Sequence, residues 1–467
     1  MIKGTKATNL KELRESGYEV LTVKEELRKN LIRKIEQGEK LFPEIIGYEN
    51  SVIPQLENAI LSGQDIIILG ERGQAKTKLI RSLTLLLDEY IPIIANCEIN
   101  DHPYKPICKR CKELVAAKAD ATPIEWLSRE ERYGEKLATP DITTPDLIGE
   151  VDPIKVAEGR YLSDELTIHF GLIPRTNRGI FAINELPDLS EKIQVGLLNI
   201  MEERDVQIRG FRVRLPLDVY IVASANPEDY TNRGRIITPL KDRYGSQIRT
   251  HYPTSLDYEI EIMEQERTVF TYKDYKISIP KFMKEVIGEI TRLARKSPFI
   301  NQRSGVSARM SISNYENLVS NALRRAIRLQ EKEVVPRVSD LPYLLASTIG
   351  KMELESIEEE KSLKLVEDLS KKAVKQVFDR YLKNDSFKKF LDQVGNTQKL
   401  EVGEDLPAIH YSQVLSRYND LMDGVITLGS YDNAAMVASA VEFILEGLHL
   451  HEKLNKEEVA GRISYRG

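Results

Sequence analysis

The spacing of apolar residues changes along the chain and predicts different kinds of structure in turn. Residues 1–40 are charged, and apolar side chains such as Leu10, Leu13, Leu27 and Leu31 recur at helical spacing. From about residue 41 to 255, helical stretches alternate with short apolar runs, of which the clearest are Asp65–Gly70, Gly179–Leu186, Asp218–Asn226 and Gln247–Tyr252. This alternation predicts an α/β fold, a mainly parallel sheet with helices on both faces.

The second half of the chain has the spacing of helices. Within residues 256–345 we predict helices over Lys281–Arg295 and Ser311–Glu333, and the strongly charged remainder ends in an amphipathic helix over Ala434–Lys453. We therefore expect an N-terminal helical segment (1–40), an α/β domain (41–255) with an insertion at about 95–135, a helical domain (256–345) and a C-terminal helical region (346–467).

Composition narrows the functional classes. The 467 residues include 67 Lys plus Arg and 72 Asp plus Glu, a net charge of −5, so there is no global attraction to nucleic acid or to an anionic membrane. No apolar run approaches the roughly 20 residues of a membrane span. Three cysteines are too few for a disulfide framework. We expect a cytoplasmic protein whose partner is neither a membrane nor nucleic acid.

A glycine-containing loop follows the first predicted strand and precedes a helical periodicity, which is the context of a phosphate-binding P-loop. Gly70 and Gly73 would let backbone N–H groups surround a phosphate. Lys76 would reach the β- and γ-phosphates, and the Thr77 hydroxyl would bind Mg²⁺. Ala75 stands where the pattern has its second glycine. The alternative is an ordinary junction between a strand and a helix.

Two later predicted strands end in polar residues. One ends in Asn184 and Glu185, and the other in Asn226 followed by proline. In P-loop enzymes the first position carries an acid that orders Mg²⁺, and the next a Glu that polarises the attacking water. Asn184 would bind a metal-bound water without adding charge, Glu185 is a candidate base, and Asn226 would hold the water or the γ-phosphate. A solvated strand end and an Asn-Pro turn are the alternatives.

Arg243 lies in the segment Leu240-Lys-Asp-Arg-Tyr-Gly245, directly before the last predicted strand of the α/β domain. An arginine that reaches the γ-phosphate bound to a neighbouring subunit would stabilise charge in the transition state. A surface ion pair is the alternative for this residue. Between the two polar strand ends, Asp205–Leu215 alternates apolar and polar residues about Gly210, which predicts a β-hairpin.

These motifs, in this order, resemble the AAA+ ATPases over about residues 40–345. The resemblance extends to the helix-2-insert clade, which holds the MoxR proteins and the magnesium-chelatase ATPase subunit. Besides the Walker A loop (Gly70–Thr77), the Walker B pair (Asn184, Glu185), the sensor 1 residue (Asn226) and the arginine finger (Arg243), the matching residues are Ile46 and Gly47 on the adenine side and Arg309 as sensor 2.

The resemblance implies a P-loop AAA+ core, a helical lid and further C-terminal helices. It also implies a Mg²⁺-dependent ATPase that forms a ring, six subunits by analogy, and remodels a protein partner carrying a von Willebrand A-like domain. Such a protein acts as a MoxR-like chaperone or a magnesium-chelatase-like motor. We expect ATP contacts from Ile46, Gly47, Gly70, Arg72, Gly73, Gln74, Ala75, Lys76, Thr77 and Leu79, Mg²⁺ ligands from Thr77 and Asn184, and catalytic roles for Glu185, Asn226, Arg243 and Arg309.

Three other functions remain open at this point. Ala75 and Asn184 depart from the Walker motifs, which would suit an ATP-binding switch without efficient hydrolysis. A sigma-54 activator would carry a Gly-Ala-Phe-Thr-Gly-Ala loop between the Walker motifs, and this sequence has none. A helicase-like ring is the third. In the predicted hairpin, Arg209, Arg212 and Arg214 would face either a ring's pore or solvent.

All three cysteines lie within fifteen residues, with one histidine among them. Cys108 and Cys111 form a CxxC pair, and Cys97 with His102 would complete a tetrahedral Cys₃His zinc site in the insertion. Such a site would be structural, because four protein ligands leave no open position for catalysis. Three free thiols or a redox pair are the alternatives.

Overall fold

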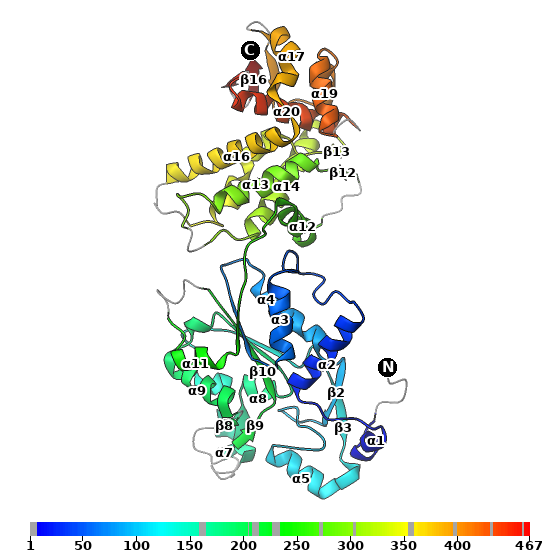
Figure 1. Cartoon of the computed structure of the whole chain (residues 1–467), viewed down its shortest axis with the longest axis vertical. Coiled ribbons are helices and arrows are strands. Elements are labelled where there is room, and N and C mark those ends of the chain that lie inside the picture. The colour runs from blue at the N-terminus through cyan, green and yellow to red at the C-terminus, as the bar shows by residue number, and fades with distance from the viewer. Residues whose placement is uncertain are drawn as a thin grey trace. The chain divides into compact units, whose positions relative to one another are not determined.

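The computed structural model describes residues 7–157, 165–203, 205–207, 214–226, 234–269, 274–301, 305–353, 359–395, 399–429, 433–459 and 462–467. The chain divides into two compact units, Met1–His251 and Tyr252–Gly467 (Figure 1). Within the described ranges, every helix is too short or too polar to cross a membrane.

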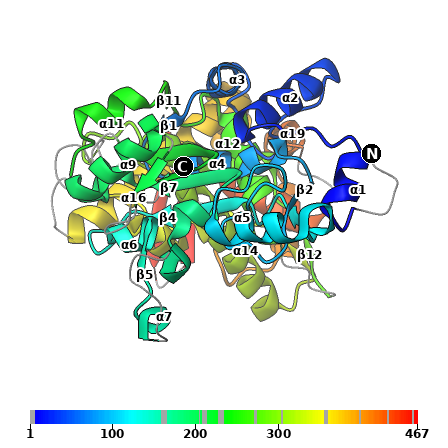
Figure 2. The same ribbon diagram turned by 90° about the horizontal axis from the view of Figure 1, so that it is seen from below.

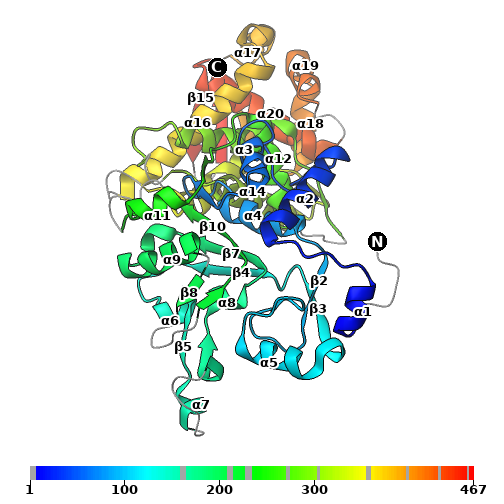
Figure 3. The ribbon, with the colours of Figure 1, turned by 60° about the horizontal axis from the view of Figure 1, so that its bottom comes forward.

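The first unit is built on a five-stranded parallel sheet, which confirms the predicted α/β class. Figure 3 shows β10, β7 and β4 in succession, and β1 lies between β10 and β11. The four strands predicted from apolar runs are all present. In sheet order the strands are β11 (Ser246–Arg249), β1 (Ile66–Leu69), β10 (Val219–Ala225), β7 (Gly179–Asn184) and β4 (Tyr133–Leu137).

Helices cover both faces of this sheet (Figure 1). Ile66 and Ile68 of β1 pack into a core with α2 (Val23–Glu36), α3 (Val52–Leu61) and α4 (Lys76–Ser82). Ile67 and Leu69, which point to the other face, belong to a core with α8 (Leu172–Arg175), α9 (Glu191–Glu203) and α11 (Thr238–Arg243). Because side chains alternate along a strand, the continuous apolar run of β1 supplies both cores.

Smaller elements extend the first unit beyond the sheet. Beside the insertion, β2 (Tyr90–Ile94) pairs in antiparallel fashion with β3 (Ile124–Ser128). The insertion also holds α5 (Lys109–Lys118), and α1 (Leu10–Glu15) packs against β3 through Leu13 and Ile124. After α6 (Thr144–Leu147), the strand β5 (Gly149–Val151) pairs in antiparallel fashion with β6 (Ile168–Phe170). Figure 2 shows α7 (Pro153–Ala157) beyond β5. The predicted hairpin is present as β8 (Asp205–Gln207) and β9 (Arg214–Pro216), whereas Arg209 and Arg212 lie outside the described residues.

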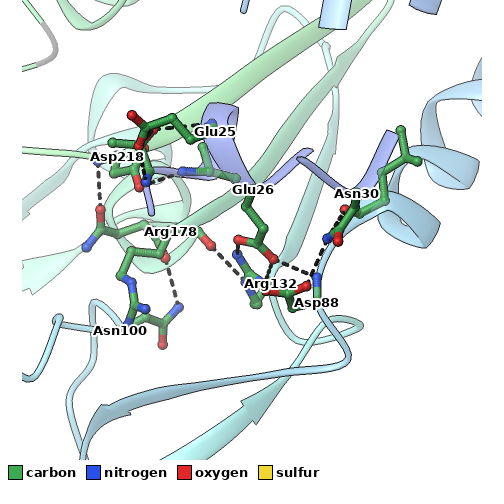
Figure 4. Close-up of polar contacts among 12 residues, drawn as sticks. Glu25, Glu26, Asn30, Asp88, Asn100, Arg132, Arg178 and Asp218 are labelled. Atoms are coloured by element: carbon green, nitrogen blue, oxygen red, sulfur yellow. Dashed lines mark hydrogen bonds and ion pairs between the residues drawn. The ribbon is translucent and has the colours of Figure 1, made fainter. Parts of the chain in front are cut away.

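A buried polar network joins α2 to the start of the sheet (Figure 4). Arg132 donates to both carboxylate oxygens of Glu26, at 2.7 and 2.5 Å, and its Nε donates to the carbonyl of Arg178 at 2.8 Å. Glu26 also accepts the backbone N–H of Asp88. The N-terminal segment predicted to end at residue 40 is therefore integrated into the first unit through α2.

The second unit is mainly helical and has one large hydrophobic core, to which α13 and the C-terminal α20 both contribute. The prediction of helices there is confirmed, but the last region also holds a three-stranded antiparallel sheet that the apolar pattern did not indicate. Its helices are α12 (Leu256–Glu266), α13 (Lys281–Ala294), α14 (Arg309–Leu329), α15 (Leu345–Ile349), α16 (Glu359–Tyr381), α17 (Lys388–Val394), α18 (Ala408–Leu415), α19 (Asn419–Thr427) and α20 (Ala434–Leu450). Its strands are β12 (Lys276–Ile277), β13 (Glu333–Val334), β14 (Leu400–Val402), β15 (Asn455–Val459) and β16 (Arg462–Arg466).

Candidate nucleotide-binding site

The loop between β1 and α4 has the backbone of a tight phosphate-binding turn. Gly73 and Ala75 both have left-handed backbone, with φ of 73° and 53°. For alanine this conformation costs about 1–2 kcal/mol. A Cβ added to Gly70 would lie 1.8 Å from Oγ1 of Thr250 and 2.4 Å from Oε1 of Gln74, so only glycine fits there. The loop is thus held in a conformation that its sequence does not favour locally.

Lys76, Asn226 and Glu185 form a continuous chain of hydrogen bonds. Nζ of Lys76 donates to Oδ1 of Asn226 at 2.5 Å, and Nδ2 of Asn226 donates to Oε2 of Glu185 at 3.0 Å. The three residues meet because they follow β1, β10 and β7, which are adjacent parallel strands with their carboxyl ends at one edge. Lys76 is buried, and its remaining N–H bonds go to the carbonyls of Gly70 and Glu71.

Asn184 contacts a carboxylate from the neighbouring strand. Its Nδ2 donates to Glu135 of β4 at 2.6 Å, and its Oδ1 accepts a hydrogen bond from Ser224. Arg81 donates twice to Glu135, at 2.7 and 3.0 Å. Burial raises the pKa of Glu135, but the hydrogen bonds from Arg81 and Tyr133 outweigh it, and the pKa lies below its usual value. A negative charge therefore lies beside the neutral Asn184, a feature that the sequence motifs did not reveal.

The segment that contains Ile46 and Gly47 contacts the P-loop through the side chain of the next residue, Tyr48. The oxygen of the Tyr48 hydroxyl lies 2.9 Å from the carbonyl oxygens of both Gln74 and His251, which share its single O–H donor. Burial raises the pKa of Tyr48 to about 12, so its hydroxyl remains a donor. Gly47 has a φ of 81°, which lets the chain turn before this contact.

The other predicted ATP contacts differ in their surroundings. Arg72 is exposed, and Thr77 is half-buried in the first turn of α4. Oε1 of Gln74 accepts hydrogen bonds from Thr250 and from the backbone of Glu71, so this side chain braces the loop. Leu79 is fully buried in the hydrophobic core that β1 forms with α2 and α3, where its side chain packs against other apolar side chains.

The two predicted catalytic arginines lie outside this hydrogen-bonded chain. Arg243, at the end of α11, forms ion pairs with Glu202 of α9 at 2.5 Å and with the adjacent Asp242. Its side chain is 38% exposed. Arg309 is exposed and begins α14 in the second unit.

The cysteines converge as predicted, but the histidine does not join them. Cys97, Cys108 and Cys111 lie together with Asp101, which replaces His102 as the fourth potential ligand. The Nδ1 atom of His102 instead accepts the backbone N–H of Tyr104 at 2.9 Å. Burial lowers the pKa of His102 to about 3, so the ring is neutral. The expected Cys₃His set is therefore corrected to Cys₃Asp.

The donor groups at the sheet edge fit a nucleotide and Mg²⁺. A loop in which Gly70 and Gly73 lack side chains, followed by the buried Lys76, offers backbone N–H groups and a positive charge to a phosphate. The Thr77 hydroxyl and the Asn184 amide are oxygen donors of the kind that Mg²⁺ binds directly or through water. These residues would hold the two groups.

Comparisons with known proteins point to one superfamily. The model of the sigma-54 interaction domain matches residues 157–240. Magnesium-chelatase subunit ChlI of Nostoc sp. is 27% identical over 264 residues, which cover 55% of this chain and 64% of that subunit. ChlI of Nephroselmis olivacea is 26% identical over 354 residues, which cover 69% of this chain and 93% of that subunit.

Two solved structures are similar to the chain at lower identity. The complex between subunits BchI and BchD of magnesium chelatase contains a chain that is 19% identical with a TM-score of 0.36, and the match covers 70% of this chain and 98% of that one. NtrX from Brucella abortus is 14% identical with a TM-score of 0.39, covering 78% and 72%. The parallel sheet, the order of the motifs and the sequence similarity to ChlI together support an AAA+ protein similar to the magnesium-chelatase ATPase subunits.

Proposed function

We propose that the chain is a Mg²⁺-dependent ATPase that assembles into a ring and uses hydrolysis to remodel a protein partner. The observation that carries this proposal is the chain of hydrogen bonds from Lys76 through Asn226 to Glu185. It links a candidate phosphate-binding cation, a polar amide and a candidate base at the carboxyl edge of a parallel sheet, where such folds bind ligands.

Lys76 would bind the phosphates of ATP. Its ammonium donates to two backbone carbonyls and an amide, and a charged phosphate oxygen is a stronger acceptor than any of these. Losing one charged hydrogen bond of about 1.5–3 kcal/mol weakens binding about 10- to 100-fold. Lys76→Ala should therefore lose affinity for a fluorescent ATP analogue. The matched control is Lys78→Ala. Lys78 lies on the same helix as Lys76 but pairs with Glu44, so this variant should bind the analogue normally.

Glu185 would accept the proton of the attacking water, and Asn226 would orient both the carboxylate and the water. A bound Mg²⁺ would supply positive charge that polarises the phosphate oxygens. Thr77 and Asn184 would hold that ion, with the Glu135 carboxylate providing the negative charge that Asn184 lacks. If Asn184 instead converts the site into a switch, ATP binds tightly and no turnover is measured.

Arg243 would act on ATP bound to the neighbouring subunit. Its exposed position and its ion pair with Glu202 leave it near the surface of the first unit, as a residue acting across an interface requires. The test is to mix Arg243→Ala and Glu185→Gln subunits, each inactive alone. Mixed rings contain interfaces in which both residues are intact, so turnover should rise well above that of either variant. No recovery would contradict action across an interface.

We further propose that the protein partner carries a von Willebrand A-like domain, on the basis of the sequence similarity to magnesium-chelatase subunits. A sigma-54 activator is the second candidate, because the sigma-54 interaction domain model matches residues 157–240. The absence of a Gly-Ala-Phe-Thr-Gly-Ala sequence argues against it. ATP-dependent binding to a purified von Willebrand A domain, with sigma-54 RNA polymerase in parallel, distinguishes the two.

A further inference from the structure

Four buried side chains of the insertion bring their potential metal ligands together beside β2. Cys97 follows the strand, Asp101 lies four residues later, and Cys108 and Cys111 lie at the start of α5. The three sulfurs and one carboxylate oxygen all lie within 4.8 Å of one another. Each residue is at most 8% exposed. None of these side chains takes part in the proposed ATPase site.

One carboxylate oxygen of this cluster, Oδ1 of Asp101, is buried without a hydrogen-bond donor among the described residues. Asp101 is fully buried, and its Oδ2 accepts the backbone N–H groups of Ile107 and Cys108 at 3.1 and 3.0 Å. A buried carboxylate oxygen left unpaired is costly, and a cation beside it removes that cost.

Each of the three sulfurs has an N–H donor close to it. The backbone N–H of Asp101 donates to Sγ of Cys97 at 3.3 Å, and that of Cys111 donates to Sγ of Cys108 at 3.4 Å. The guanidinium of Arg110 approaches Sγ of Cys111 at 3.9 Å. Such donors stabilise thiolates and orient them as ligands.

We propose that Cys97, Asp101, Cys108 and Cys111 bind one Zn²⁺ in a four-coordinate structural site. Thiolates select zinc over the hard ions Mg²⁺ and Ca²⁺. A Zn–S bond of about 2.3 Å places the sulfurs of a tetrahedron about 3.8 Å apart, so the observed cluster needs only a small contraction. Binding releases the thiol protons to solvent. With four protein ligands, the ion has no open position for catalysis.

The zinc site would fix the insertion against the strand that carries the Walker B pair. Asn100 donates to the carbonyl of Arg175 at 2.8 Å, and Asn177 donates to the carbonyl of Ile99 at 3.0 Å. These contacts join the metal loop to the segment directly before β7, and Figure 4 shows Asn100 beside Arg178 there. Loss of the ion should therefore destabilise the first unit without removing a catalytic group.

The test uses the full chain, purified without a metal-binding tag, and measures bound metal by mass spectrometry together with the reactivity of the thiols. We expect one zinc per chain and three thiols that become reactive only after chelation. Asp101→Asn should weaken zinc binding at least about tenfold. His102→Gln is the matched control at the adjacent residue and should keep full stoichiometry, because His102 lies outside the cluster.

Three outcomes would overturn the proposal. The first is protein that stays metal-free, with three reactive thiols, after incubation with zinc. The second is a disulfide between two of the cysteines in protein purified under reducing conditions. The third is equal zinc affinity in Asp101→Asn and the wild type. If Asp101→Asn fails to fold, the thiol protection and metal content of the wild-type chain still decide between zinc and free thiols. The result is independent of whether the chain hydrolyses ATP.

Discussion

Replacing Arg132 with methionine should strongly destabilise the first unit. The guanidinium makes two hydrogen bonds to Glu26 and one to the carbonyl of Arg178, and Arg132 and Glu26 have side chains only 1% and 5% exposed. Methionine keeps much of the apolar contact but removes all three bonds. Glu26 is then a buried carboxylate whose remaining donor is the backbone N–H of Asp88.

The expected loss follows from that uncompensated charge. Breaking a buried ion pair by removing one partner costs about 3–5 kcal/mol. For a unit of about this size, 1 kcal/mol corresponds to about 2–4 °C in the melting temperature, so the variant should melt about 6–20 °C lower. The chain has one tryptophan, Trp126, and it lies in the first unit. Its fluorescence therefore reports unfolding of that unit alone.

Arg14→Met supplies the control for this measurement. Arg14 pairs with Asp120 at 2.5 Å, but the two side chains are 57% and 55% exposed, so its loss should cost less than about 1 kcal/mol. Adding Glu26→Gln to Arg132→Met should destabilise by less than the sum of the two single effects, because the pair is then removed together. If Arg132→Met melts no lower than Arg14→Met, the reasoning about the buried network is refuted.

Three further changes probe the candidate nucleotide site. Gly70→Ala should abolish binding of an ATP analogue and destabilise the first unit by about 1–3 kcal/mol, because its Cβ would lie 1.8 Å from Thr250. Ala75→Gly removes the strain of an alanine with left-handed backbone. The affinity for the analogue should therefore not fall, and the free energy of unfolding should change by less than about 1 kcal/mol. Weaker binding would contradict this. Asn184→Asp puts a second carboxylate beside Glu135, so its melting temperature should fall without Mg²⁺ and recover when Mg²⁺ is added; equal melting in both conditions would contradict this.

The central sheet could be predicted from sequence because its strands are continuous apolar runs, as in Ile66–Leu69. β4 and the C-terminal sheet could not, since Tyr133–Leu137 and Asn455–Val459 are rich in charged residues and are strands only through pairing with distant segments. The N-terminal segment likewise looked separate, because the pairing of Glu26 with Arg132 joins residues far apart in sequence.

Lys76, Asn226 and Glu185 each follow a strand of the sheet, and they meet because parallel strands place their carboxyl ends at one edge. Glu135 was missed because no motif marks a residue on the adjacent strand. The spacing of the cysteines and the histidine in the sequence also favoured His102, and not the preceding Asp101, as the fourth metal ligand. Spacing does not reveal which way a side chain points, and in the fold Asp101 faces the sulfurs.

The proposed ATPase is best tested by measuring ATP turnover by the purified full chain, with and without Mg²⁺, beside the Glu185→Gln variant. We expect Mg²⁺-dependent hydrolysis in the wild type and a loss of about 10²- to 10⁴-fold in the variant, which should still bind ATP. Turnover unchanged in Glu185→Gln, or no turnover by the wild type under conditions where it binds ATP and assembles with itself, would contradict the proposed ATPase.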